Sequence, residues 1–388
     1  KQEKFILWFD EVGRDDIPLV GGKNANLGEM YQNLTNATSE MYPDEKIQVP
    51  YGFAVTAYAY KYFLEKSSLE NKITDALASL DTANMKQLEE VGGKIRDMII
   101  SSPFPQELED AIRSAYRELG NKLQIHDSVD VAVRSSATAE DLPDASFAGQ
   151  QESYLNIKGE DRLLEAIKKA ISSLFTNRAI SYRVDQHFDH FAIALSVAVQ
   201  KMARSDRGAS GVMFTLDTES GFRDVVLING SWGLGEYVVK GIVTPDEFMV
   251  FKPTLKKAYK PIISKKLGSK EKKLIYATDG TSPTKDVQVE MNDRQRFVLT
   301  DEQVLRLSRW GMMIEDHYQK PMDIEWAYDA EENQLYIVQA RPETVQARKN
   351  MTILEEYVLL GEGKVLTKGA SVGRKIGQGK ARFIKDPS

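Results

Sequence analysis

The sequence predicts an α+β fold with two or more lobes. Its 388 residues are enough to form two or three hydrophobic cores. Over roughly the first 125 residues, short apolar strands alternate with amphipathic helices, whereas strands dominate from Ile193 onward. We therefore expect a first lobe over roughly residues 1–190 and a second lobe over residues 191–347.

The first half of the chain carries most of the helical patterns. Residues 5–8 predict a strand, and residues 24–30 predict a helix that follows a turn. Apolar residues at helical spacing cover residues 69–100, 107–119 and 163–180, the last as one long helix. Residues 31–48 and 137–151 lack periodicity and predict loops, and the strand over residues 130–133 is expected to end at Arg134.

The second half predicts strands and then a change of character. Strands are expected at residues 193–202, 211–215, 224–228 and 248–251, followed by a hairpin of residues 322–328 and 334–340. We expect residues 348–360 to form a linking helix. Residues 361–388, which are rich in Gly and Lys, are expected to begin another domain that is mostly missing.

Composition disfavours several classes of function. The net charge of −6, without a basic stripe, argues against a nucleic-acid partner. No apolar run approaches the roughly 20 residues of a membrane helix, and the apolar part of the start is too short for a signal peptide. The absence of cysteine removes thiolate nucleophiles and disulfides. We expect a cytoplasmic protein.

Two segments suit the binding of an anion. Lys23 follows two glycines, which let a backbone approach a ligand closely, and its ammonium suits phosphate. Arg134 precedes Ser135 and Ser136 and the Gly-containing loop over residues 144–151, so a forked donor and several N–H groups lie close together. A solvated lysine, a salt-bridged arginine and an ordinary loop remain the alternatives.

A strand near Gln200 suits a flat base. Alternation places Leu195, Val197 and Val199 on one face, and the smaller or polar residues, with Gln200, on the other. That second face could form the floor of a cleft. A strand between two packed layers would show the same pattern.

The hairpin carries the most informative group of polar residues. Asp323 and Glu325 share one face of the first strand, and Gln339 and Arg341 share one face of the second. A turn centred on Glu332 places Glu325 opposite Gln339 and Asp323 opposite Arg341. Carboxylate and amide oxygens suit Mg²⁺ that also binds phosphate. Cross-strand ion pairing on a wet face is the alternative, and a slip of one residue would remove the arrangement.

These residues belong to long segments that resemble the N-terminal ATP-grasp domain of phosphoenolpyruvate synthases, a family related to pyruvate phosphate dikinase and the rifampicin phosphotransferases. The similarity spans roughly residues 5–347 and is carried by residues 20–30 (VGGKNANLGEM), 133–151 (VRSSATAEDLPDASFAGQQ), 211–222 (GVMFTLDTESGF), 231–236 (SWGLGE), 322–327 (MDIEWA) and 339–344 (QARPET).

The resemblance implies an ATP-grasp fold with the nucleotide between the lobes, and ATP and Mg²⁺ as ligands. By the resemblance, Lys23, Arg134 and Arg341 would be catalytic phosphate ligands, and Gly149 and Ser153 would belong to a phosphate-covering loop. The adenine edge would contact Gln200, Lys201 and Met202. Glu325 and Gln339 would bind metal or phosphate, with Asp323 and Glu236 as further metal ligands. Ser153 departs from relatives that have Thr, but the hydroxyl is kept.

The resemblance also implies a reaction that continues outside this chain. In the family, ATP phosphorylates a histidine on a swivelling phosphocarrier domain, which delivers the phosphoryl group to pyruvate in a barrel domain. The carrier histidine lies in a Gly-Gly-x-x-x-His context, and none of the four histidines here does. Residues 361–388 resemble the first strands of the swivelling domain. A rifampicin-type phosphotransferase half and a stand-alone nucleotide-binding protein are the alternatives.

Overall fold

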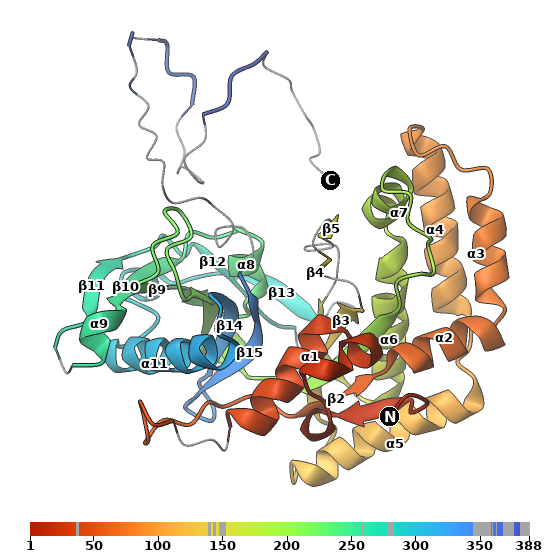
Figure 1. Cartoon of the computed structure of the whole chain (residues 1–388), viewed down its shortest axis with the longest axis horizontal. Helices are drawn as coiled ribbons and strands as arrows, with labels where there is room; N and C mark the ends of the chain where they lie inside the picture. The colour runs from red at the N-terminus through yellow and green to blue at the C-terminus, as the bar shows by residue number, and fades with distance from the viewer. Residues whose placement is uncertain are drawn as a thin grey trace.

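Two lobes, each built on an antiparallel sheet, make up the molecule (Figure 1). The computed structural model describes residues 1–35, 39–138, 141–142, 145–146, 153–257, 259–277, 283–343, 358, 360–361, 363–367 and 376–380. The mixed α+β architecture with two lobes agrees with the fold class that the sequence predicts.

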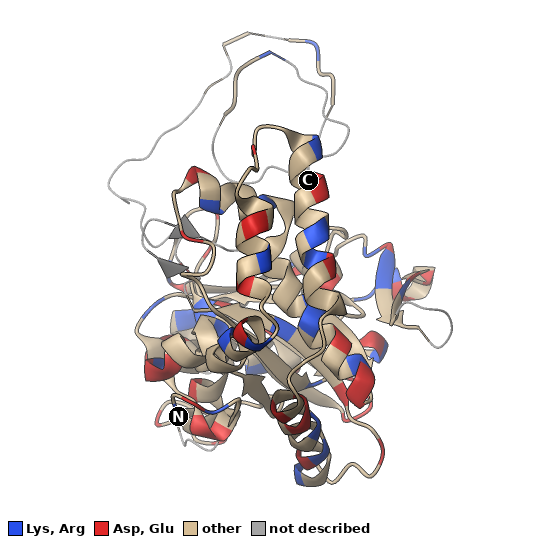
Figure 2. Ribbon diagram, turned by 90° about the vertical axis from the view of Figure 1, so that its right-hand side faces the viewer, with Lys and Arg blue, Asp and Glu red and all other residues tan. Residues whose placement is uncertain are grey.

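The first lobe is a five-stranded sheet of order β1-β2-β7-β3-β6 that is covered by helices. Its strands are β1 (Ile6–Trp8), β2 (Gly52–Val55), β3 (Asp130–Ala137), β6 (Ser153–Lys158) and β7 (Leu195–Lys201). Its helices are α2 (Ala57–Lys66), α3 (Leu69–Leu77), α4 (Met85–Ser101), α5 (Gln106–Lys122), α6 (Glu160–Ser172) and α7 (Asn177–Asp185). Figure 2 shows acidic and basic residues interspersed along these helices.

The predicted long helix over residues 163–180, and the stretch of helical spacing over residues 69–100, are each divided at a capping residue. Residues 69–100 form α3 and α4, and the side chain of Asn84 caps α4 by accepting from the Gln87 N–H at 3.2 Å. Residues 163–180 form α6, a 3₁₀ turn (η3, Ser173–Phe175) and α7. Thr176 is extended (φ −66°, ψ 154°) and accepts from the Ala179 N–H at 3.2 Å. Hydroxyl and amide caps of this kind start a new helix inside a continuous apolar stripe.

The predicted alternation along β7 is confirmed. Leu195, Val197 and Val199 lie in the core between the sheet and helices α2–α7. On the opposite face, Ala198 contacts the core of the second lobe and Gln200 lines a cavity. One face of β7 therefore packs in the core of the first lobe, and Gln200 on the other face borders the cavity.

The second lobe is a six-stranded sheet of order β11-β10-β9-β8-β14-β15. Its strands are β8 (Ala209–Phe214), β9 (Val225–Trp232), β10 (Asp246–Phe251), β11 (Ile262–Lys266), β14 (Met322–Asp329) and β15 (Gln334–Pro342). Helix α11 (Asp301–Tyr318) packs on it through Val304, Leu307, Trp310 and Ile314. The remaining elements are α8 (Glu236–Val239), α9 (Lys252–Leu255), α10 (Met291–Arg294), 3₁₀ turns η1 (Phe9–Glu11), η2 (Arg14–Asp16) and η4 (Ser205–Arg207), and the strand pairs β12 (Lys272–Tyr276) with β13 (Thr284–Gln288) and β4 (Asp141–Leu142) with β5 (Ala145–Ser146).

Helix α1 (Ile17–Asn33) joins the two lobes. It packs against β3 and β7 of the first sheet and against β15 of the second. Its residues Leu27 and Met30 lie in the core of the second lobe. Because β7 pairs with β2 and β3, sheet membership divides the chain after Lys201 rather than at residue 190.

An ion pair without solvent exposure holds part of the second lobe. Lys270 Nζ donates to Asp246 Oδ1 at 2.5 Å, and both side chains are 0% exposed. The ammonium also donates to the carbonyls of Gly268 and Arg294, and Asp246 accepts from the N–H groups of Gly268 and Val298. Every polar atom of the pair therefore has a partner.

Lys270→Met is expected to destabilise the protein by about 3–5 kcal/mol, because it leaves the Asp246 carboxylate buried without a counter-charge. Urea unfolding followed by circular dichroism measures the effect. Lys266→Met, which removes an exposed partner of Glu247, serves as the control and should leave the midpoint nearly unchanged. Equal midpoints for the two variants would contradict the expectation.

The predicted C-terminal segments fall largely outside the described residues. Those described between residues 358 and 380 form no helix or strand. The linking helix over residues 348–360 and the start of a further domain over residues 361–388 therefore stay predictions. Within the described residues, no helix has the length and apolar character needed to cross a membrane.

Candidate functional site

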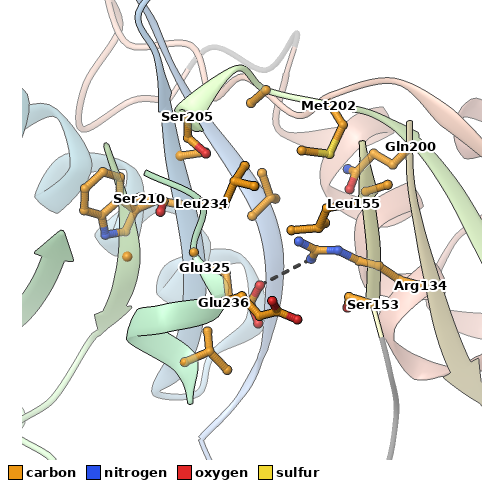
Figure 3. A pocket seen from close by; sticks show the side chains of 18 of the residues that line it. Arg134, Ser153, Leu155, Gln200, Met202, Ser205, Ser210, Leu234, Glu236 and Glu325 are labelled. Atoms are coloured by element: carbon orange, nitrogen blue, oxygen red, sulfur yellow. Dashed lines mark hydrogen bonds and ion pairs between the residues drawn. The ribbon is translucent and has the colours of Figure 1, made fainter. Parts of the chain in front are cut away.

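A cavity of about 390 Å³ lies between the two sheets (Figure 3). Strands β3, β6 and β7 of the first lobe supply one wall, and β8, β14, β15 and α8 of the second lobe supply the other. Charged residues gather at one end and apolar residues at the other. The predicted site residues that line it are Arg134, Ser153, Gln200, Lys201, Met202, Glu236 and Glu325.

Arg134 is the central cation of the polar end. Its Nη1 lies 3.3 Å from Glu325 Oε2 on the opposite lobe, and the two side chains are 17% and 25% exposed. Its Nε is buried and has no hydrogen-bond partner among the described residues. An unsatisfied buried donor is costly unless a ligand accepts from it. The guanidinium therefore has a partner for Nη1 but none for Nε, and it can donate a further hydrogen bond to an anion.

Arg134 lies inside a strand, contrary to the expected position at a strand end. β3 continues to Ala137 because residues 135–137 pair with β7, Ser135 opposite Val197 and Ser136 opposite Ser196. Arg134 itself stands opposite Ser153 of β6, which brings the predicted phosphate ligand beside a predicted residue of the phosphate-covering loop. Gly149, which was predicted to lie in the same phosphate-covering loop as Ser153, lies outside the described residues.

The far end of the cavity is apolar. Ala132, Met202 and Leu234 form a small buried cluster, and Leu155 packs against it. Gln200 is held by its amide, which donates to the Pro50 carbonyl at 3.1 Å. The backbone N–H groups of Lys201 and Met202 donate to Tyr51 and Asp130.

A flat base placed at this end would stack between apolar side chains from both lobes. The backbone N–H groups of Lys201 and Met202 already donate within the protein, so such a base would form its hydrogen bonds with other groups at this end of the cavity.

The predicted register of the hairpin is confirmed. Glu325 stands opposite Gln339 and Asp323 opposite Arg341. A bulge after Glu325 shifts the later pairs by one residue and leaves Val338, which lines the cavity, without a directly opposite partner. The hairpin thus presents Glu325 to the cavity and keeps the second polar pair further along the same strands.

That second pair forms a tight ion pair. Arg341 Nε and Nη2 lie 2.9 and 2.8 Å from Asp323 Oδ2. Burial raises the pKa of the Asp323 carboxyl, and the Arg341 guanidinium acts in the opposite direction. Asp323, Gln339 and Arg341 do not line the cavity, so the structure brings the four hairpin residues together on one sheet but exposes only Glu325 to the pocket.

Lys23 lies on α1, one residue after the predicted pair of glycines. Gly21 has φ 73° and ψ 165°, which kinks the helix, and a Cβ there would lie 2.3 Å from Ser136 Oγ. This close approach ties the start of α1 to β3, and Asn24 adds a hydrogen bond from its N–H to Ser136 Oγ at 3.3 Å. Lys23 does not line the cavity but projects from a helix that packs on β15, the strand of Arg341.

The donor set fits a magnesium ion shared with a ligand. Glu325 and Glu236 supply carboxylates at the polar end, and the Gln339 amide stands opposite Glu325. Among the described residues, no three carboxylate or imidazole groups converge as a metal cage. Mg²⁺ typically uses one or two carboxylates and completes its shell with phosphate oxygens and water. The residues therefore suit an ion that arrives with a phosphate ligand.

Sequence reasoning missed the contribution of α7. Thr176, the N-cap of this helix, and Arg178 both line the cavity. The capping threonine inside an apolar stripe was the signal that could have revealed the break between α6 and α7. Arg178 is exposed and adds a second arginine to the wall of the cavity.

The chain shows similarity to known proteins over its whole length. It is 52% identical to phosphoenolpyruvate synthase of Synechocystis over 398 residues, an alignment that covers 100% of this chain and 48% of that protein. Phosphoenolpyruvate synthases of Aquifex aeolicus and Escherichia coli are 51% and 47% identical, with 45% and 47% of their lengths covered and 100% and 99% of this chain. The chain thus spans about half the length of these relatives.

A family match agrees with the geometry of the cavity, which joins an apolar end to an arginine and two carboxylates. Residues 17–358 match the family described as pyruvate phosphate dikinase, AMP/ATP-binding domain. The matched range includes all the strands that line the cavity. The chain therefore belongs to the AMP/ATP-binding domain family of pyruvate phosphate dikinase.

Proposed function

We propose that this chain binds Mg·ATP between its two lobes and serves as the nucleotide-binding part of a phosphoenolpyruvate synthase. The observation that carries the proposal is Arg134, whose buried Nε has no partner and whose Nη1 faces Glu325 across a cavity with an apolar far end. The base would occupy the apolar end, near Gln200, Lys201 and Met202. The phosphates would then extend towards Arg134 and Ser153.

The proposed chemistry of this half is positioning and charge neutralisation. Arg134 would donate to the phosphates directly, and Lys23 and Arg341, on α1 and β15, would approach the terminal phosphate as the lobes close around the nucleotide. Glu325, Gln339 and Glu236, with Asp323 as a further candidate, would hold the Mg²⁺, which would supply charge neutralisation at the transferring group. The Asp323–Arg341 pair would fix the direction of the arginine.

The acceptor of the phosphoryl group lies outside the residues of this chain. By the proposal it is a histidine of a phosphocarrier domain. Pyruvate, bound on a barrel domain, receives the group to give phosphoenolpyruvate, and water is consumed as AMP and phosphate are released from ATP. The relatives named phosphoenolpyruvate synthase are about twice as long as this chain, which supports such additional domains. A cytoplasmic location is part of the same proposal, because it is where such a metabolic enzyme would meet its substrates.

Isothermal titration calorimetry with Mg²⁺ and a non-hydrolysable ATP analogue tests the binding proposal. The chain should bind the complex with one site, and Glu325→Gln should weaken binding by about tenfold or more in Mg²⁺, because one charged metal ligand is lost. Without Mg²⁺ the variant should bind at least as well as the parent, since a carboxylate no longer faces the phosphates. An absence of binding in Mg²⁺ would reject the proposal.

A coupled assay tests the division of the reaction. The chain alone should form no phosphoenolpyruvate from ATP and pyruvate, because none of its histidines has the carrier context. The full-length Escherichia coli relative, assayed in parallel, provides the positive control. Product formation by the purified chain would show that the carrier step does not require another domain.

A further inference from the structure

A second hollow, of about 610 Å³, lies on the second lobe. We call it the α9–α11 groove, because it lies where α9 and the C-terminal end of α11 approach the segment before β9. It shares no lining residue with the nucleotide cavity. The residues that line it are Met41, Arg223, Asp224, Lys252, Pro253, Lys256, Lys257, Met312, Glu315, Asp316, Gln319, Lys320 and Pro321.

Positive charge exceeds negative charge in the α9–α11 groove. It has five cationic side chains and three carboxylates. Among the described residues, four of the cations have side chains without a hydrogen bond or ion pair: Arg223, Lys256, Lys257 and Lys320. Because the cations outnumber the carboxylates, part of their mutual repulsion is not compensated, and a bound anion would relieve it.

Lys252 is a largely buried donor among the residues that line the groove. Its side chain is only 10% exposed, its Nζ donates to the Thr215 carbonyl at 2.6 Å, and it pairs with Glu315. Burial lowers the pKa of Lys252, and Glu315 opposes that shift. An ammonium has three N–H donors, so one remains after these two contacts.

We propose that the α9–α11 groove binds a small phosphorylated molecule that also carries hydroxyl groups. A phosphate monoester matches Arg223, Lys256, Lys257 and Lys320 in charge, and Lys252 has one N–H left to donate. The carboxylates of Asp224 and Asp316, which form no ion pair among the described residues, would accept hydrogen bonds from the hydroxyls. The volume falls within the roughly 300–1,000 Å³ typical of small-molecule sites.

Two strands that line the nucleotide cavity end beside the groove. Thr215, which receives the Lys252 hydrogen bond, follows β8, and Ser210 and Gly211 near the other end of β8 line the nucleotide cavity. Pro321 of the groove immediately precedes β14, which carries Glu325. The two sites are therefore separate but are connected through continuous backbone.

Methionine methyl NMR distinguishes the two sites. Met41 and Met312 line the groove and Met202 lines the nucleotide cavity, so ¹³C-methyl labelling reports each separately. Glucose 6-phosphate, as a probe, should shift the Met41 and Met312 signals saturably and leave Met202 unchanged. Glucose should cause no shift, and inorganic phosphate should bind more weakly. An ATP analogue with Mg²⁺ should shift Met202, which tests the nucleotide site independently.

A triple variant tests the residues. Arg223→Gln, Lys256→Gln and Lys320→Gln together should weaken glucose 6-phosphate binding by at least about tenfold, since charge-assisted hydrogen bonds are lost. These side chains have no partners to lose, so folding should be unaffected. The matched control is Lys61→Gln, Lys86→Gln and Arg162→Gln on the first lobe, which should bind as the parent does.

Several outcomes would overturn the proposal. They are the absence of a shift at Met41 and Met312, a probe response confined to Met202, and equal affinity of the triple variant and the parent. Equal affinity for inorganic phosphate would reject the role of the hydroxyls. Tighter binding of a hexaglutamate peptide would assign the groove to an acidic polypeptide instead.

Discussion

Arg134→Gln is expected to lower the affinity for Mg·ATP by about two orders of magnitude. Charge-assisted hydrogen bonds contribute about 1.5–3 kcal/mol each, and about 1.4 kcal/mol corresponds to a factor of ten. The substitution removes the buried Nε donor and also leaves Glu325 without its partner at 3.3 Å. Calorimetry with Mg²⁺ and a non-hydrolysable analogue measures the loss.

Two further variants show whether the loss of Mg·ATP affinity results from removing the planar pair of guanidinium donors. Arg134→Lys keeps the charge but not the planar pair of donors, so an intermediate affinity is expected. Arg117→Gln removes an exposed arginine that pairs with Glu160 in the first lobe, and it should bind as the parent does. If Arg134→Gln retained the parent affinity, the phosphates would have to bind elsewhere.

Gly21→Ala is expected to destabilise the protein by at least about 3 kcal/mol, since it combines a glycine-only backbone conformation with a steric clash. At φ 73° and ψ 165°, a Cβ would lie 2.3 Å from Ser136 Oγ and 2.4 Å from the Ser136 carbonyl oxygen. α1 would have to move away from β3 and take Lys23 with it. Urea unfolding and Mg·ATP calorimetry should both register the change.

The matched control for this variant is Gly93→Ala on α4. A Cβ at Gly93 would meet only the end of the Arg96 side chain, at 3.9 Å. Alanine there should stabilise the helix by about 0.5–1 kcal/mol, because glycine is a poor helix former. A Gly21→Ala variant as stable as the parent would show that the kink at Gly21 is not required.

The Arg134 and Gly21 variants test two different interactions that position the site. Arg134 lies on β3 and acts through a contact with the opposite lobe, whereas Gly21 acts through the packing of α1 on β3. Both depend on β3, which also pairs with β7 and therefore positions Gln200. One strand of the first lobe thus organises the polar end and the apolar end of the cavity.

Much of the local structure could be predicted from the sequence. The alternation along β7 and the register of the β14–β15 hairpin follow from patterns with a period of two, and both are confirmed. The prediction of one continuous helix over residues 163–180 was wrong, because the cap at Thr176 interrupts an apolar stripe that continues across it. Asn84 divides the helical spacing of residues 69–100 in the same way. A stripe reports which face is buried, and not whether the backbone is continuous.

By itself, the sequence determined the α+β class, the pairing of Glu325 with Gln339 and of Asp323 with Arg341, and the choice of Arg134 and Lys23 as phosphate-binding candidates. Those features depend on residues close in the chain or on long matching segments. Only the tertiary structure decided that Arg134 faces Glu325, that the Asp323–Arg341 pair lies outside the cavity, and that Arg178 joins the wall. Each of these depends on how the two lobes pack around the cavity, and such packing of segments far apart in the chain leaves no periodic signal in the sequence.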